Sequence, residues 1–283
     1  MVDTVTKVDY VDEFVAVFER RHSLLRSTTT QATNINGLTA QFNVAGSTGE
    51  AVTRGANGLI PYAPSNQTAV SVTLNEWHAA ESKTTFNVYT GQSDQRRIMY
   101  MNCMAKINRR DDLDIITALT AATQRVSATA AVADFDMVTK AKGILGAGSV
   151  PMDGRVFGLI SPAFLAYLEQ NTEFSSKDYI DSSVLPNSQM SWSDQPQVYR
   201  WMGVNWIVHP GLPGAGTASE TNFLYHMNAI GHASIMTPNQ TAIGFNDEQD
   251  YSYCRASGFS NAKLLQNTGV VKMLHDGSAV VAV

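Results

Sequence analysis

The sequence predicts an α+β fold, in which one long helix sits among many short strands. Residues 94–124 contain no proline or glycine, which favours a helix of about 46 Å at 1.5 Å per residue. Residues 38–44 and 70–74 alternate apolar and polar side chains, the period of a half-buried strand. The C-terminal third is a series of short apolar runs separated by turn residues, which predicts further strands.

Residues 8–26 predict an amphipathic helix that begins at Asp9 and carries arginines near its end. Its apolar stripe consists of Val11, Phe14, Val15 and Phe18. The stripe can dock on the core of its own chain, or on a neighbouring copy or a scaffold, and the sequence leaves these alternatives open. Phe14 and Phe18 are therefore candidates for contacts between subunits.

Residues 38–89 predict a long hairpin with a glycine-rich tip at 45–58 that closes at Pro61 and Pro64. The returning arm is expected to continue as a strand through Trp77 toward Phe86. A two-stranded ribbon is only marginally stable alone. The hairpin must therefore pack on another part of the protein or on another copy.

The second half of the chain predicts a helical and a strand-rich part. Ser161 followed by Pro162 is typical of a helix start, with a capping hydroxyl and proline at the first helical position. The expected elements are helices over 134–145 and 163–170 and strands over 155–160, 206–208, 223–227, 241–245, 251–259 and 270–274. The polar residues 109–112 in the long helix are expected to form a solvated face.

The composition favours an oligomer that stays in a reducing compartment. Charged residues make up 16 % of the chain, against about 25 % in typical soluble proteins, and interface cores are depleted of charge. The net charge of −5 gives no drive toward nucleic acid. Cys103 and Cys254 fit neither a disulfide framework nor zinc spacing. No apolar run is long enough for a membrane span, and no signal peptide is recognisable.

The sequence contains no recognisable catalytic, cofactor-binding or metal-binding motif. The G-x-S-x-G, H-E-x-x-H and P-loop patterns are absent. Residues 143–148 superficially resemble a dinucleotide loop, but they end a helix instead of opening one. His226 and His232 lie six apart in strand-like sequence, too far to share a metal, and Cys103 is expected to be a packed thiol. A triad assembled in space from distant residues remains open.

Several short segments resemble the major capsid protein family of tailed phages, whose fold is shared with encapsulins and the herpesvirus capsid floor. The matching segments, in chain order, are DFDMV at 134–138, RVFGLISP at 155–162, MGVNWIV at 202–208, NAIGHA at 228–233, GFSNAK at 258–263 and GVV at 269–271. Each match is short, and their shared order over about residues 8–275 is the specific signal.

The resemblance implies a shell subunit, not an enzyme, with no cofactor. It implies an N-terminal arm over 1–37, an E-loop hairpin over 38–89, a peripheral domain with a spine helix over 90–133, an axial domain with a central mixed sheet over 134–228, and return strands over 229–283. Hexamers and pentamers of the chain would form an icosahedral head around double-stranded DNA, bound without sequence specificity. A separate scaffolding protein and a portal are the implied partners, and the sequence leaves open whether a decoration protein binds.

Arg54 at the hairpin tip, and Glu76, Trp77 and Glu81 on its return arm, are the further candidates for contacts between subunits. Some family members join an E-loop lysine covalently to a neighbour, but residues 36–82 contain no lysine. We therefore expect a shell without cross-links, in the virion, assembled in the host cytoplasm. An encapsulin or a gene-transfer-agent shell is the nearest alternative, and an α+β hydrolase or binding protein a remote one.

Overall fold

The computed structural model describes residues 22–33, 35–46, 50–58, 60, 62, 66–90, 95–175, 198–235 and 241–281. The chain divides into two compact units. Unit 1 is built mainly from Glu76–Asp111 and Ile235–Phe259, and unit 2 from Leu24–Asn75, Asp112–Ser234 and Ser260–Val283. Within the described residues, no helix is both long and apolar enough to cross a membrane.

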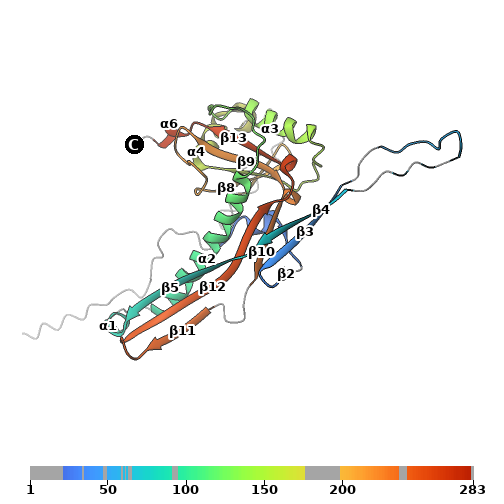
Figure 1. Ribbon diagram of the computed structural model, residues 1–283. Helices are drawn as coiled ribbons and strands as arrows, with labels where there is room; N and C mark the ends of the chain where they lie inside the picture. The colour runs from blue at the N-terminus through green and yellow to red at the C-terminus, as the bar shows by residue number, and fades with distance from the viewer. Residues whose placement is uncertain are drawn as a thin grey trace, which may run out of the picture. The chain divides into compact units, whose positions relative to one another are not determined.

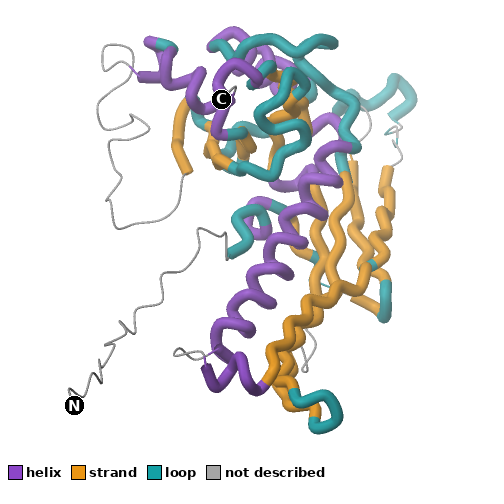
Figure 2. The backbone as a smooth tube through the Cα atoms, turned by 90° about the vertical axis from the view of Figure 1, so that its left-hand side faces the viewer, coloured by secondary structure: helices purple, strands orange, loops and turns teal. Residues whose placement is uncertain are grey.

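Unit 1 packs a helix on one face of a sheet. The helix is α2 (Gln95–Thr120), and the strands are β5 (Asn75–Thr84), β11 (Thr241–Asn246) and β12 (Tyr251–Leu264). β12 pairs with both β11 and β5. Alternate strand residues point to the helix, so Ala79, Cys254 and Ala256 pack on Met99 and Cys103 of α2. Figure 2 shows α2 running along these strands. α2 and β12 both continue into unit 2.

The structure differs from the expected strand at the end of β5. The strand ends at Thr84, and α1 (Thr85–Thr90) follows, which contains Phe86. The Thr84 hydroxyl accepts a hydrogen bond from the amide of Asn87 at 3.4 Å, and the Thr85 hydroxyl donates to the Asp250 carboxylate at 2.6 Å. One local bond, at Thr84, and one long-range bond, at Thr85, thus accompany the start of a helix where the side-chain pattern alone predicted a strand.

Unit 2 has a five-stranded mixed sheet at its centre, as the resemblance implied. The strand order is β13 (Val270–His275), β9 (Glu220–His226), β6 (Val156–Ile160), β8 (Val204–Val208) and β7 (Val198–Trp201). β6 and β8 are parallel, and the remaining pairs are antiparallel. β6 and β8 are buried almost throughout, which explains their continuous apolar sequences.

Helices α3 (Phe135–Ala147) and α4 (Pro162–Gln170) pack on this sheet and begin as the sequence predicts. Asp134 caps α3, and the Ser161 hydroxyl caps α4 by accepting from the amide of Phe164 at 3.0 Å. α3 was expected to end at residue 145, but it continues to Ala147. Glycine interrupts a helix only weakly when the helix is packed, and Gly148 provides the cap.

The remaining elements of unit 2 include a hairpin and several short segments. β3 (Thr39–Gly46) and β4 (Asn66–Thr73) form the hairpin, with β2 (Ile35–Asn36) beside β3. Figure 1 shows β3 and β4 leading into an extended loop. The short segments are β1 (Thr30–Gln31), β10 (Ile230–Ile235), α5 (Thr172–Ser175), α6 (Ser278–Val281) and the 3-10 turns η1 (Arg26–Thr28), η2 (Met227–Ala229) and η3 (Asn267–Gly269).

Candidate assembly surfaces

The hairpin of β3 and β4 is buried only at its base. The two strands pair in register from Thr39 opposite Thr73 to Gly46 opposite Asn66. Ala40, Phe42 and Val72 are buried, whereas every described residue of the loop beyond the strands is exposed. The predicted alternation of the two arms is therefore confirmed, and the hairpin has no core of its own.

Specific contacts hold the base of the hairpin to β10 and β12. The Lys263 ammonium donates to the carbonyl of Ser71 at 2.9 Å, and the Asn261 amide donates to the carbonyl of Thr73 at 2.6 Å. The Phe42 ring lies so close to Gly231 that a Cβ there would approach it to 2.9 Å. Only glycine at position 231 allows this approach.

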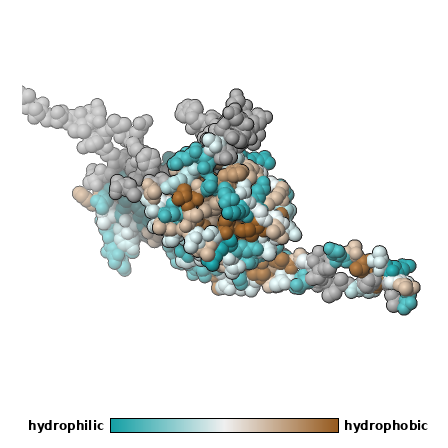
Figure 3. Space-filling model, turned by 90° about the horizontal axis from the view of Figure 1, so that it is seen from above, coloured by the Kyte–Doolittle hydropathy of each residue, from teal (hydrophilic) through white to brown (hydrophobic). Residues whose placement is uncertain are grey.

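The loop between β3 and β4 presents apolar side chains to solvent. Val52 is 63 % exposed, Ile60 54 % and Tyr62 92 %. Arg54 lies among them and is also exposed. In Figure 3 the arm that corresponds to this loop shows brown hydrophobic residues among hydrophilic ones. Three exposed apolar side chains on one loop make it a candidate contact surface.

Glu76, Trp77 and Glu81 lie on β5 and each has a partner within the chain. The Glu76 carboxylate is 3.0 Å from Nε2 of His78. Trp77 packs under the Arg110 guanidinium, which is 3.8 Å from the ring centre. Glu81 pairs with Lys106 of α2 at 3.8 Å. β5 itself, which the sequence assigned to the hairpin, pairs with β12. Phe14 and Phe18 lie outside the described residues.

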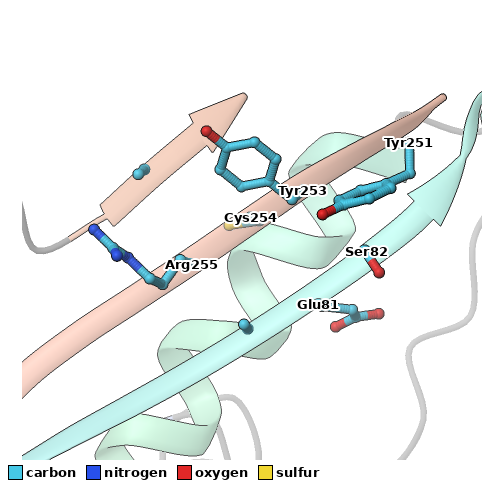
Figure 4. A pocket seen from close by; sticks show the side chains of 8 residues that line it. Glu81, Ser82, Tyr251, Tyr253, Cys254 and Arg255 are labelled. Carbon is cyan, nitrogen blue, oxygen red and sulfur yellow. The ribbon is translucent and has the colours of Figure 1, made fainter. Parts of the chain in front are cut away.

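A shallow trough crosses the face of the unit 1 sheet that points away from α2 (Figure 4). Its volume is about 380 Å³, and it is lined by Ala80, Glu81, Ser82, Ala242, Tyr251, Tyr253, Cys254 and Arg255. The Tyr253 hydroxyl lies over Gly244, where a Cβ would come within 2.5 Å of it. Sequence reasoning missed this trough, because its residues come from three strands whose pairing no local pattern reveals.

The buried acids of α2 correct the expectation of a solvated face at 109–112. Asp111 and Asp112 are 2 % and 0 % exposed. The Asp112 carboxylate accepts from the amides of Leu24 at 3.3 Å and Leu25 at 3.2 Å, and Nε2 of His209 lies 3.7 Å away. These partners are more than eighty positions from Asp112 in the chain, so local charge patterning could not identify them.

The polar residues where β6 ends and β9 begins also bond to one another within the fold. The Ser161 hydroxyl donates to the Glu220 carboxylate, which also accepts from the Asn222 amide at 2.8 Å and the Gly216 amide at 3.0 Å. Ser161, Glu220 and Asn222 are fully buried. A serine that caps a helix and is sealed from solvent stabilises the fold and has no access to a substrate.

Four histidines, His209, His226, His232 and His275, and both cysteines are also buried. η2 separates β9 from β10 and so places His226 and His232 on different strands. His226 bonds Asp153 at 3.1 Å, and His232 bonds Gln31 at 3.0 Å. Burial raises the pKa of the Cys103 thiol to about 11, so it stays protonated at neutral pH, as expected of a packed thiol. No group of three potential metal ligands occurs among the described residues.

Comparisons with known proteins identify the architecture. A sequence model of the phage capsid protein family matches residues 2–277. A search of curated proteins gives no significant match. The capsid of cyanophage Pam1 has a TM-score of 0.74 at 12 % identity and covers 98 % of both chains. A structure from Mycobacterium phage Che8 has a TM-score of 0.71 at 14 % identity, covering 96 % of this chain and 98 % of that one.

A third similar structure is the capsid of a native gene-transfer-agent (GTA) particle, with a TM-score of 0.68 at 13 % identity and 96 % coverage of both chains. The similarity to these structures extends over nearly the whole of each chain, which confirms the predicted fold. The match of the family model extends over nearly the whole chain. The chain belongs to the phage capsid protein family and has the fold of a tailed-phage major capsid protein.

Proposed function

We propose that this chain assembles into the hexamers and pentamers of an icosahedral phage head that encloses double-stranded DNA, and that it catalyses no reaction. The observation that carries this proposal is the hairpin, whose base is anchored while all described residues of its loop are exposed. Apolar side chains on an arm without a core gain stability when another copy covers them.

The hairpin loop supplies one charged contact between copies. Arg54 is exposed on the loop, and Glu76 is the more accessible of the two acidic candidates, with 55 % of its side chain exposed against 23 % for Glu81. We infer that Arg54 of one copy pairs with Glu76 of its neighbour. Trp77 supports this contact by packing on Arg110 and holding β5 against α2.

The charge of the chain suits a container for DNA. A net charge of −5 opposes tight binding of the genome, so DNA is enclosed without sequence-specific contacts. The subunits assemble in the cytoplasm of the host with a separate scaffolding protein, and the head carries a portal. A GTA shell is the second candidate, because a GTA capsid is among the similar structures. If the gene for this chain lies with portal and terminase genes inside a complete phage genome, the phage head is favoured over the GTA shell.

Charge reversal tests the contact between copies. Arg54→Glu should lower the yield of shells about tenfold while the subunit melts at its normal temperature, because two acids then face each other across the contact. Combining Arg54→Glu with Glu76→Arg should restore the yield, and Arg54→Glu with Glu81→Arg is the matched control. Shell yields are measured by sedimentation. An unchanged yield for Arg54→Glu would remove Arg54 from the contact.

A further inference from the structure

One flank of unit 1 displays apolar side chains with no described cover. Ile243 and Phe245 on β11 are 53 % and 45 % exposed. In the pairing with β12, Ile243 lies opposite Cys254 and Phe245 opposite Ser252. Paired residues of antiparallel strands point to the same side, and Cys254 packs on α2. The two exposed side chains are therefore on the helix side of the sheet, beyond the edge that α2 covers.

The two sides of α2 differ in character. The side toward β5 is polar: Gln95 bonds Lys83 at 2.5 Å, and Asn102 bonds Glu81 at 3.4 Å. Tyr100 and Met104 lie on the opposite side by helical spacing. Tyr100 is 38 % exposed and Met104 is half-buried. Helical spacing and strand register thus place Tyr100, Met104, Ile243 and Phe245 on the same flank of unit 1, and these four residues are called here the flank strip.

We propose that residues 8–21 of the same chain dock on the flank strip as an amphipathic helix. Val11, Phe14, Val15 and Phe18 recur at the spacing of one helix face. Such a face fits a groove between a helix and an edge strand. The inference does not depend on shell assembly, and it assigns Phe14 and Phe18 to a contact within the chain.

The anchored start of the described chain puts the segment within reach. The amides of Leu24 and Leu25 bond Asp112 of α2, and Leu25 is fully buried. From Asp112 back to Arg96, α2 spans about 24 Å at 1.5 Å per residue. A helix over residues 9–21 spans about 18 Å, and residues 22–24 add up to about 10 Å. The segment can therefore run antiparallel to α2 along the strip.

The distribution of charge also favours an antiparallel orientation of the segment relative to α2. A segment that leaves Leu24 along α2 brings its acidic start, with Asp9, Asp12 and Glu13, toward the start of α2. The first turn of α2 contains no acid and carries Arg96 and Arg97, both exposed. Acids near these arginines and near a helix N-terminus are stabilising. A tether of three residues also gives the chain's own segment a millimolar effective concentration, which favours it over a second copy.

Photo-cross-linking tests the occupant of the flank strip. A benzophenone amino acid replaces Phe14 on the apolar side of the segment or, as control, Asp12 on its polar side. We expect position 14 to link to peptides from residues 95–109 or 241–255 in a product that migrates as a monomer. Position 12 should give at least fivefold less of it. A product of dimer size would assign the strip to a second copy and overturn the proposal, as would the absence of such links.

Proteolysis tests the strip from the other side. Ile243→Asp combined with Phe245→Asp should increase the rate of tryptic cleavage after Arg20 and Arg21 at least tenfold, because the segment loses its apolar contact. Tyr253→Asp is the matched control: Tyr253 is 37 % exposed on the opposite side of the sheet. The chains are compared in the same assembly state, with folding checked by circular dichroism. Equal cleavage rates in the double variant and the control would contradict the proposal.

Discussion

Single residues in this subunit are constrained most where secondary-structure elements approach closely. Gly158 lies on β6 opposite Trp206 of β8, and a Cβ at position 158 would come within 2.3 Å of the indole. Gly158→Ala should therefore lower the free energy of unfolding by about 3 kcal/mol through overpacking. Gly143→Ala is the control in α3, where a Cβ meets nothing within 4 Å, and it should stabilise by about 0.5–1 kcal/mol. Guanidinium denaturation measures both changes.

Asp112 gives a second prediction at the residue scale. Asp112→Ala should cost about 3 kcal/mol or more, because the buried amide of Leu25 and the partly buried amide of Leu24 lose their acceptor and His209 loses a neighbouring carboxylate. The control is Asp136→Ala, whose exposed pair with Lys140 within α3 should contribute less than about 1 kcal/mol. Equal shifts of the denaturation midpoint would show that Asp112 does not anchor the start of the chain.

The contrast between Asp112 and Ser161 shows which residue roles a sequence reveals. The Ser161 cap is local, since its hydroxyl bonds an amide three positions later, and the Ser-Pro pair predicted it. The partners of Asp112 are Leu24 and Leu25, which precede η1, and His209, which follows β8. No residue near Asp112 in the sequence indicates these partners. Residue roles that depend on long-range partners become visible only in the fold.

At the scale of elements, regular periodicity predicted α2, α4 and most strands, including both arms of the hairpin. β7 and β10 were missed because their sequences lack a clear alternation. β5 alternates apolar and polar residues as the hairpin arm does, so the sequence assigned it to the hairpin. Alternation does not identify the partner of a strand, and β5 pairs with β12. The trough beside Tyr253 was unpredictable for the same reason.

The hairpin also supports a prediction about the finished particle. An amide cross-link from the hairpin to a neighbour needs a lysine, and residues 36–82 contain none. Lys83, the first lysine after them, already bonds Gln95 at 2.5 Å. Particles boiled in detergent should therefore release monomers of 30.7 kDa. Covalent ladders that persist on a reducing gel would contradict this prediction.

For the whole molecule, the low fraction of charged residues and the exposed apolar side chains of the hairpin loop are typical of a subunit that buries surface against other copies. The 16 % of charged residues leaves much neutral surface, and many modest contacts add up in a closed shell. We propose that the base of the hairpin, which is anchored by Lys263 and Asn261, lets the loop contact different neighbours without disturbing the central sheet. Unit 2 has its own buried core, which does not include the hairpin loop.

Cryo-electron microscopy of particles formed by the purified chain tests whether the hairpin joins copies into a shell. We expect icosahedral shells in which β3, β4 and the loop between them lie on a neighbouring copy, with Val52, Ile60 and Tyr62 covered there. A particle no larger than a dimer, with this hairpin folded against its own subunit, would contradict this expectation.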